Sequence, residues 1–249
     1  MLTSEKRTDK KHEQEECNLE QNMNHLPLDI VPLLESSSIP MERKDHICFG
    51  ISPFNSLFSE EYLSSLVYFA LKNFKSFHFF LPDAPTIHTL EALGYSESDS
   101  RKKMKKQINW LRNKMHKALA ANGLSSEKEN YILDAERLEK NDAFQDELKT
   151  VYGFFDFDPA FRKDCLDASR WVLQNKMEEK FITEQVLLKA VKYFLFEIPL
   201  FAATNKIVQS PTSIFCYHQH ISFHEKLYQN LLSYTPSFGQ GYGMIQQNT

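Results

Sequence analysis

A serine lies where the sequence changes from a strand pattern to a helix pattern. The run from 46 to 56, HICFGISPFNS, begins with a short apolar segment and ends in a turn that contains Pro53. Ser59 can then cap a helix whose first turn is acidic. Ser52 therefore lies at the carboxyl end of a predicted strand, which is where open α/β sheets bind ligands.

Two other interpretations of this serine are open. Ser52 and Asn55 can be turn residues whose side chains hydrogen-bond their own backbone. Ser52 can also be the nucleophile of an ester hydrolase, but the Gly-x-Ser-x-Gly elbow of such enzymes requires glycine where Phe54 stands. The esterase interpretation is therefore weak.

A tyrosine and a glutamate form the second candidate pair. They lie in an apolar helix that is predicted from 183 to 197 and ended by Pro199. Tyr193 and Glu197 are four residues apart and therefore share a helix face. A carboxylate so near an apolar helix end is unfavourable unless it is paired or used in chemistry. A structural Tyr–Glu hydrogen bond, or a glutamate at the surface, would also fit.

The last predicted strand, 213–218, carries a third group of reactive side chains. Cys216, His218 and His220 fall on one face of this strand and its extension. Such a trio could suggest zinc. The close Cys-x-His-x-His spacing would crowd a tetrahedral site, however, and no second ligand pair supports it. We therefore expect no metal.

The segment 101–117 predicts a helix with an unusual charge pattern. Every charged side chain in it is basic, and its apolar residues fall on one face. The solvated face of an acidic protein usually mixes both signs. An ordinary exposed helix remains an alternative, but we expect this surface to bind phosphate groups.

The predicted elements that position these residues follow an α/β pattern. The strand before Ser52 and a second strand are joined by a crossover of helical length, which makes a βαβ unit with parallel strands. The remaining expected elements are a short strand and three helices. In chain order, the second strand is 77–81, the first of these helices 85–93, the short strand 131–133, and the other helices 142–152 and 161–176.

Composition limits the class of protein. A chain of 249 residues, 42% of them hydrophobic, suits one α/β domain with one core. The net charge of -4 gives no overall sign of nucleic-acid binding, so that signal must be local. The four cysteines form no Cys-x-x-Cys pair, which is typical of reduced thiols in a cytoplasmic protein. No apolar run reaches the length of a membrane span, and the polar first 21 residues are no secretory signal.

Three regions are expected along the chain. Residues 1–40 are rich in Lys, Glu, Gln and Asn and predict a flexible leader. Residues 41–236 contain the motifs and predict the catalytic domain. Residues 237–249, with several glycines and glutamines, predict a disordered tail.

Taken together and in this order, the motifs resemble the cyclodipeptide synthases over about residues 44 to 235. The resemblance implies a single Rossmann-like domain with a parallel sheet flanked by helices, similar to the catalytic domains of class I aminoacyl-tRNA synthetases of the tyrosine and tryptophan type. Asn55, Tyr217 and His218 match the Asn/Tyr/His signature of the larger of two subfamilies. The matching segments are GISPFNS at 50–56, FLPD at 80–83, the basic helix, YFLFEIP at 193–199 and CYH at 216–218.

This resemblance implies an enzyme that uses two aminoacyl-tRNAs to make a cyclic dipeptide. The reaction would pass through an aminoacyl-serine and then a dipeptidyl-serine, with no cofactor. Ser52 would be the nucleophile, while Tyr193 and Glu197 would hold the α-amino group of the first residue. Glu197 would also transfer a proton, and Tyr217 would place the substrate and move protons during cyclisation.

The resemblance also implies which residues bind the substrates. Gly50 and Asn55 would shape the loop around Ser52, with His218 beside them. We expect a hydrophobic first amino acid, because the side chains implied for its pocket are mostly apolar: Cys48, Gly50, Phe80, Leu200 and Phe215. The implied tRNA contacts are Arg101, Lys102, Lys103, Lys105, Lys106, Arg112 and Lys114.

The motifs that are absent agree with a reaction that needs no ATP. The sequence has no Gly-x-x-x-x-Gly-Lys-Ser/Thr loop, no Gly-x-Gly-x-x-Gly and neither synthetase ATP signature, which excludes an authentic synthetase. The alternative function is a non-catalytic, tRNA-binding regulatory protein on the same fold. The intact set of Ser52, Tyr193, Glu197 and Tyr217 argues against it. We expect a monomer, with a dimer as the alternative.

Overall fold

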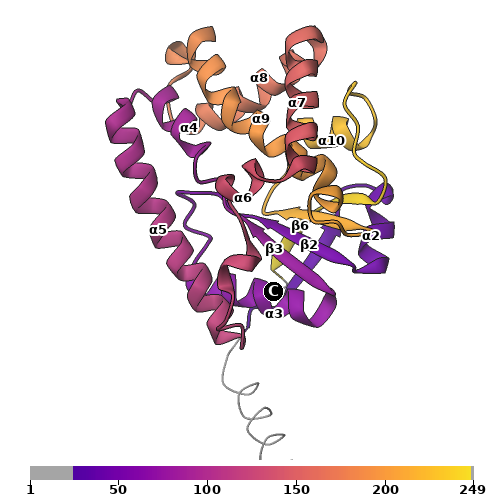
Figure 1. The fold of residues 1–249 in the computed structure, drawn as a ribbon. Coiled ribbons are helices and arrows are strands. Elements are labelled where there is room, and N and C mark those ends of the chain that lie inside the picture. Colours follow the sequence, from indigo (N-terminus) through magenta and orange to yellow (C-terminus); the bar gives the residue numbers. More distant parts are fainter. Residues whose placement is uncertain (1–24, 248–249) are drawn as a thin grey trace, which may run out of the picture.

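The computed structural model describes residues 25–247, and within this range six strands form one sheet flanked by helices (Figure 1). The order across the sheet is β1-β6-β5-β2-β3-β4. β1 is antiparallel to β6, and all other neighbours are parallel, as the βαβ pattern predicts. The bounds are β1 Leu28–Pro32, β2 His46–Gly50, β3 Ser76–Phe80, β4 Ile132–Leu133, β5 Ser213–Tyr217 and β6 Gln240–Gln247.

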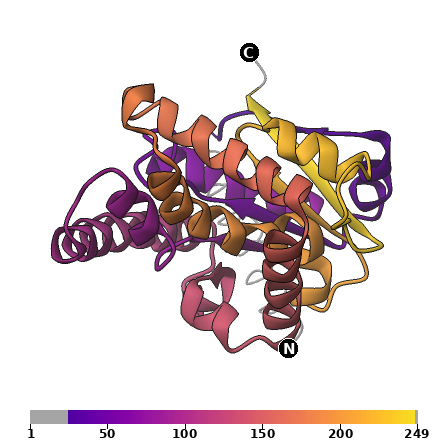
Figure 2. The same ribbon diagram turned by 90° about the horizontal axis from the view of Figure 1, so that it is seen from above.

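The helices cover both faces of the sheet, as the view from above shows (Figure 2). Short 3-10 turns lie at Glu35–Ser37, Lys128–Tyr131 and Glu179–Phe181. The α-helices are α2 Ser38–Arg43, α3 Glu60–Asn73, α4 Thr86–Ala92, α5 Glu97–Ala121, α6 Ala135–Glu139, α7 Asp142–Phe157, α8 Pro159–Gln174, α9 Glu184–Ile207 and α10 Ser222–Tyr228.

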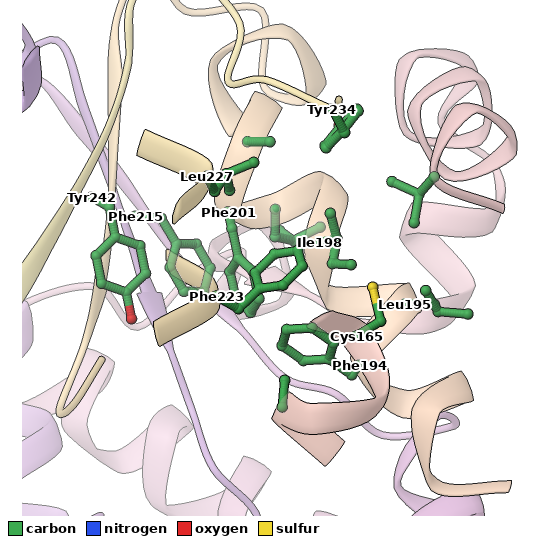
Figure 3. Packing of buried hydrophobic residues seen from close by; sticks show 14 of the residues in the cluster. Cys165, Phe194, Leu195, Ile198, Phe201, Phe215, Phe223, Leu227, Tyr234 and Tyr242 are labelled. Carbon is green, nitrogen blue, oxygen red and sulfur yellow. The ribbon is translucent and has the colours of Figure 1, made fainter. Parts of the chain in front are cut away.

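β2 explains how the two layers are built. All five of its residues are buried, as expected for a parallel strand with both faces covered. Ile47 and Phe49 point to one face and pack with α3 and α5, whereas Cys48 points to the opposite face. There, Phe215 of β5 and Tyr242 of β6 pack against Phe201 of α9, and the cluster continues through side chains of α10 and α8 (Figure 3).

The structure corrects the expected end of the long apolar helix. α9 does not stop near Pro199 but continues to Ile207, with non-helical backbone angles at Ala203 (φ -150°, ψ 25°). Proline removes one backbone donor from a helix and strains the turn before it. Here both Pro199 and the turn after it are buried, and the Thr204 hydroxyl donates to the Leu200 carbonyl. Tertiary packing therefore holds the helix together across its kink.

The expected disordered tail, 237–249, is wrong for the residues that the structure describes. β6 lies between β5 and β1, and Tyr242 is completely buried. The glycines of this segment allow close packing: a Cβ on Gly243 would lie 2.6 Å from Cγ2 of Ile30. The domain therefore extends beyond the expected limits of 41 and 236, with β1 at one end and β6 at the other. The first 24 residues of the expected leader lie outside the described part.

Candidate active site at the carboxyl ends of the strands

A cavity of about 890 Å³ opens where β2 and β5 end. Ser52 follows β2, Tyr217 is the last residue of β5, and Tyr193 and Glu197 come from α9. All four line this cavity, as do Asn55 and His218 beside them. The four side chains for which catalytic roles were expected are therefore brought together from three segments that are distant in sequence.

The loop that carries Ser52 is held at both ends. The Ile51 amide donates to the Phe80 carbonyl at 3.0 Å, which extends the pairing of β2 and β3. Asn55 accepts a hydrogen bond from the Leu57 amide at 3.0 Å, and its Nδ2 contacts Nε2 of His218 at 3.1 Å. The turn interpretation is thus correct for Asn55, whose side chain also joins the loop to the end of β5.

His218 is neutral in this position. Burial lowers its pKa to about 4, so its ring carries no charge near neutral pH. A neutral ring can accept the hydrogen bond from Asn55 through Nε2 while its Nδ1 carries the proton. The Asn55–His218 contact therefore does not depend on a charge.

The Tyr217 hydroxyl interacts with the side chain of Ser52. Burial and the nearby Glu197 raise the pKa of Tyr217 well above its usual value, so this phenol stays protonated. A protonated phenol can both donate and accept a hydrogen bond. Tyr217 can therefore hold Ser52 in place and pass a proton at its oxygen.

Glu197 is a buried carboxyl group without an ion-pair partner in the described part of the chain. It is 8% exposed, which excludes the alternative of a surface glutamate, and it interacts with the Tyr193 side chain. Burial raises the pKa of Glu197 to about 8, although the interaction with Tyr193 partly opposes this shift. A buried acid of this kind is stabilised as a carboxylate when a cation binds beside it. The cavity therefore suits a ligand with an ammonium group.

The residues implied for the first aminoacyl pocket lie behind the cavity wall. Cys48, Phe80, Leu200 and Phe215 are each at most 1% exposed and belong to the core. Gly50 lies directly beneath the site, because a Cβ there would come within 2.7 Å of both Phe215 and Tyr217. Gly50 thus allows the Tyr217 ring to approach the loop of Ser52.

Sequence reasoning did not find the apolar wall of the cavity. This wall comes from α4, α8 and α9, which pack together although α4 is far from the other two in sequence. Their inward positions looked like ordinary core positions, since helical spacing alone does not separate a cavity wall from a core. The apolar lining includes Leu90, Leu93, Val172, Leu173, Ala190 and Phe194.

The basic helix is α5, and it offers only part of its charge to solvent. Lys102, Lys105 and Lys106 are exposed, and Lys103 lines the cavity. Arg101 is exposed but pairs with Glu97 on the preceding turn, with 2.8 Å between Nη2 and Oε1.

Arg112 and Lys114 are engaged inside the molecule, unlike the other expected tRNA contacts. Arg112 pairs with Glu129 at 2.6 Å and with Asp134 at 2.8 Å. Lys114 Nζ donates to the Phe58 carbonyl at 3.0 Å and lies 3.4 Å from the centre of the Trp110 ring. These two side chains attach α5 to its neighbours, because they lie on the side of the helix that faces the body of the domain. The exposed basic surface that can bind phosphate groups is therefore limited to the first half of α5.

The Cys216, His218 and His220 side chains do not meet. Cys216 is completely buried in the core, and His220 contacts Glu225 at 2.9 Å and the sulfur of Met244 at 2.8 Å. Within residues 25–247, no group of three His, Cys, Asp or Glu side chains could hold a metal ion. None of the helices described in that range is long and apolar enough to cross a membrane.

Fold and cavity together define a Rossmann-like α/β protein with a serine, two phenols and a carboxyl group at the carboxyl ends of parallel strands. The cyclodipeptide synthase family model matches residues 28–247. The chain belongs to the cyclodipeptide synthase family. It is therefore a tRNA-dependent aminoacyltransferase.

Individual proteins agree with this family. The cyclo(L-leucyl-L-leucyl) synthase of Bacillus subtilis is 31% identical over 222 residues, which are 86% of this chain and 88% of the relative. A solved cyclodipeptide synthase from Bacillus thermoamylovorans is 30% identical, with a TM-score of 0.82 over 93% of this chain and all of the other.

A Mycobacterium tuberculosis structure connects the fold to the synthetases. It is 26% identical, with a TM-score of 0.79 over 92% of this chain and 98% of the other, and it is described as demonstrating that cyclodipeptide synthetases are related to type I tRNA synthetases. The fold expected from the resemblance is thus confirmed.

Proposed function

We propose that this chain takes two aminoacyl groups in turn from two aminoacyl-tRNAs and joins them into a cyclic dipeptide through esters of Ser52. The observation that supports this most is the meeting of Ser52, Tyr217, Tyr193 and Glu197 on one cavity. One chain supplies all four side chains, so a monomer is sufficient. We place the reaction in the cytoplasm, where aminoacyl-tRNA is made.

The first step exchanges one ester for another. The Ser52 oxygen attacks the ester carbonyl of the first aminoacyl-tRNA, the bond to the terminal ribose oxygen breaks, and that oxygen takes the proton released by Ser52. Tyr217 interacts with Ser52 and can orient the hydroxyl for this attack. Because both ester bonds are of similar energy, the step needs no ATP.

Glu197 and Tyr193 would hold the amino group of the bound residue. A substrate ammonium would give the buried carboxyl the charge partner that it lacks in the described chain and so favour its ionised form. In that state the carboxylate can later take a proton from the ammonium and leave a nucleophilic amine.

The second aminoacyl-tRNA would then acylate this amine. The new amide bond forms as the second tRNA leaves, and the product is a dipeptide esterified to Ser52. The free amine of the second residue attacks the Ser52 ester, closes the six-membered ring and returns the hydroxyl to Ser52. Tyr217 lies beside this ester and can supply the proton that the serine oxygen takes up.

We further propose hydrophobic amino acids, with leucine first among them. The cavity wall made by α4, α8 and α9 is rich in aliphatic side chains. The Bacillus subtilis relative is a cyclo(L-leucyl-L-leucyl) synthase. Apolar pockets separate side chains that differ by one methylene by only about 1–3 kcal/mol, so we expect a mixture of products.

Mass spectrometry of the medium of a bacterium that expresses this chain tests the proposal. We expect a cyclic dipeptide with hydrophobic side chains, its loss in Ser52→Ala, and its retention in Ser125→Ala, which changes an exposed serine in a loop away from the cavity. If neither chain made a dipeptide, the regulatory tRNA-binding function would be favoured instead. Equal production by Ser52→Ala would show that Ser52 is not the nucleophile.

A further inference from the structure

We infer that Phe54 and Tyr95 form a shelf on which the terminal base of the tRNA acceptor end stacks, with Lys103 fixed beside them. This inference rests on the proposed function. It assigns a nucleobase site to two aromatic side chains that have no role in the catalytic steps. Phe54 belongs to the loop of Ser52, and Tyr95 lies between α4 and α5.

Both rings are exposed at the cavity that contains Ser52. Phe54 is 40% exposed and Tyr95 is 41% exposed, and both line the cavity. Large aromatic side chains normally gain by burial, so two half-exposed rings at one cavity are available for a flat ligand that can stack on them. A base is such a ligand, because each base has a π-face that stacks on aromatic side chains.

Lys103 connects the two rings and adds a positive charge. Its Nζ donates to the Tyr95 hydroxyl at 2.6 Å and lies 4.2 Å from the centre of that ring. The same nitrogen lies 6.0 Å from the centre of the Phe54 ring. A lysine held next to aromatic rings fits a nucleotide, since the base can stack while the cation faces its phosphate.

The backbone at Phe54 is unfavourable without a gain elsewhere. Its φ is 65°, in the left-handed region that bulky residues rarely adopt. The Phe54 ring lies at the cavity and remains 40% exposed, so burial of the ring does not offset the backbone strain. Stacking of a ligand on the ring would offset it.

The position of the shelf fits the chemistry of the substrate. The aminoacyl ester is carried by the ribose of the terminal nucleotide, so its base must lie within one nucleotide of the nucleophile. Phe54 is two residues from Ser52. Tyr95 lies next to Ser96, the N-cap of α5, whose first half carries the exposed lysines. Trp171, another exposed ring at the cavity, lies instead on α8.

A binding experiment with uncharged tRNA isolates this contact from the chemistry. We compare leucine tRNA that ends in CCA with the same tRNA without its terminal adenosine, using filter binding. Stacking of one base on aromatic side chains corresponds to about a tenfold or larger change in affinity. We expect the protein to bind intact tRNA at least about tenfold more tightly, and Phe54→Ala and Tyr95→Ala to bring this ratio close to one.

Matched variants separate stacking from loss of structure. Phe54→Tyr should keep the ratio, because it restores an aromatic face. Phe181→Ala is the control, since Phe181 is 53% exposed with Lys180 4.9 Å from its ring centre but does not line the cavity. It should also keep the ratio.

Three results would overturn the shelf. One is a protein that binds both tRNAs equally, and another is a ratio that survives in Phe54→Ala and Tyr95→Ala. The third is a ratio that only Trp171→Ala removes, which would move the base to α8. A cyclic dipeptide made by a protein without this ratio would refute the shelf alone, whereas absence of tRNA binding would refute the proposed function too.

Discussion

At the scale of single residues, Glu197 gives the sharpest test of the site. The pKa of a folded-state glutamate at about 8 lies far above its usual value, so the folded protein holds a proton that the unfolded chain releases. The free energy of unfolding must therefore fall as pH rises from about 4.5 to about 8. The burial that prepares Glu197 for an ammonium thus lowers stability near neutral pH.

Glu197→Gln should remove this pH dependence. The amide resembles the protonated acid, so we expect similar stability to the parent at pH 4.5 and higher stability at pH 9, by on the order of 4 kcal/mol. Urea unfolding at a series of pH values measures the difference. Glu184→Gln, on an exposed position of the same helix, is the control. Parallel curves for Glu197→Gln and the parent chain would contradict the burial of an unpaired carboxyl group.

The residue types of the site could be chosen from the sequence, but their surroundings could not. Ser52 at a strand end and the i, i+4 pair of Tyr193 and Glu197 follow from local spacing. Whether Glu197 is buried depends on packing of α9 against distant segments, which local spacing does not contain. For the same reason, Arg112 was assigned to phosphate although Glu129 and Asp134 already neutralise it.

At the scale of elements, β6 shows where composition misleads. Glycine and glutamine are typical of disordered tails, yet Gly241 and Gly243 occur here because neighbouring side chains press against the strand. The alternation that predicts a strand was hidden, since glycine contributes no apolar side chain. The predicted α9 was too short for a related reason. Proline ends most helices, but not one whose kink is buried in the core.

Tyr242→Ala tests the structural role of β6. Tyr242 is fully buried and its hydroxyl donates to the Gln219 carbonyl at 2.9 Å, so its loss should lower the free energy of unfolding by about 3–5 kcal/mol. Gln246→Ala, at the exposed end of the same strand, should change it by less than about 0.5 kcal/mol. Denaturant unfolding measures both. If neither variant changed the free energy of unfolding, β6 would not contribute to the folded domain and a disordered tail would be the better interpretation.

At the scale of the whole molecule, the charge is distributed unevenly. The chain has a net charge of -4, yet the exposed side chains in the first half of α5 carry a net positive charge. A local positive surface on an acidic protein directs a polyanion to one place and repels it from the rest. Here that place adjoins the cavity, because Lys103 belongs to both.

Replacing Lys102, Lys103, Lys105 and Lys106 by glutamine should weaken tRNA binding without changing the chemistry of bound substrate. Each lost phosphate contact should reduce the slope of log affinity against log salt by about 0.9. KM for charged tRNA should therefore rise, while kcat changes little. The control replaces four exposed lysines elsewhere, Lys140, Lys149, Lys163 and Lys180. An unchanged salt slope in the α5 variant would refute the phosphate surface.

The order of strands in the sheet has a consequence for how the protein folds. β2 pairs with β3, its near neighbour in the chain, but also with β5, and the Asp45–Thr212 bond at the start of these strands spans 167 residues. Closing so long a loop is slow compared with forming helices. Ser52 follows β2 and Tyr217 ends β5, so both residues come together only when these strands pair. The helices and the β2–β3 pair therefore form before the site does. A refolding chain therefore regains its circular dichroism before it regains a site that can be acylated.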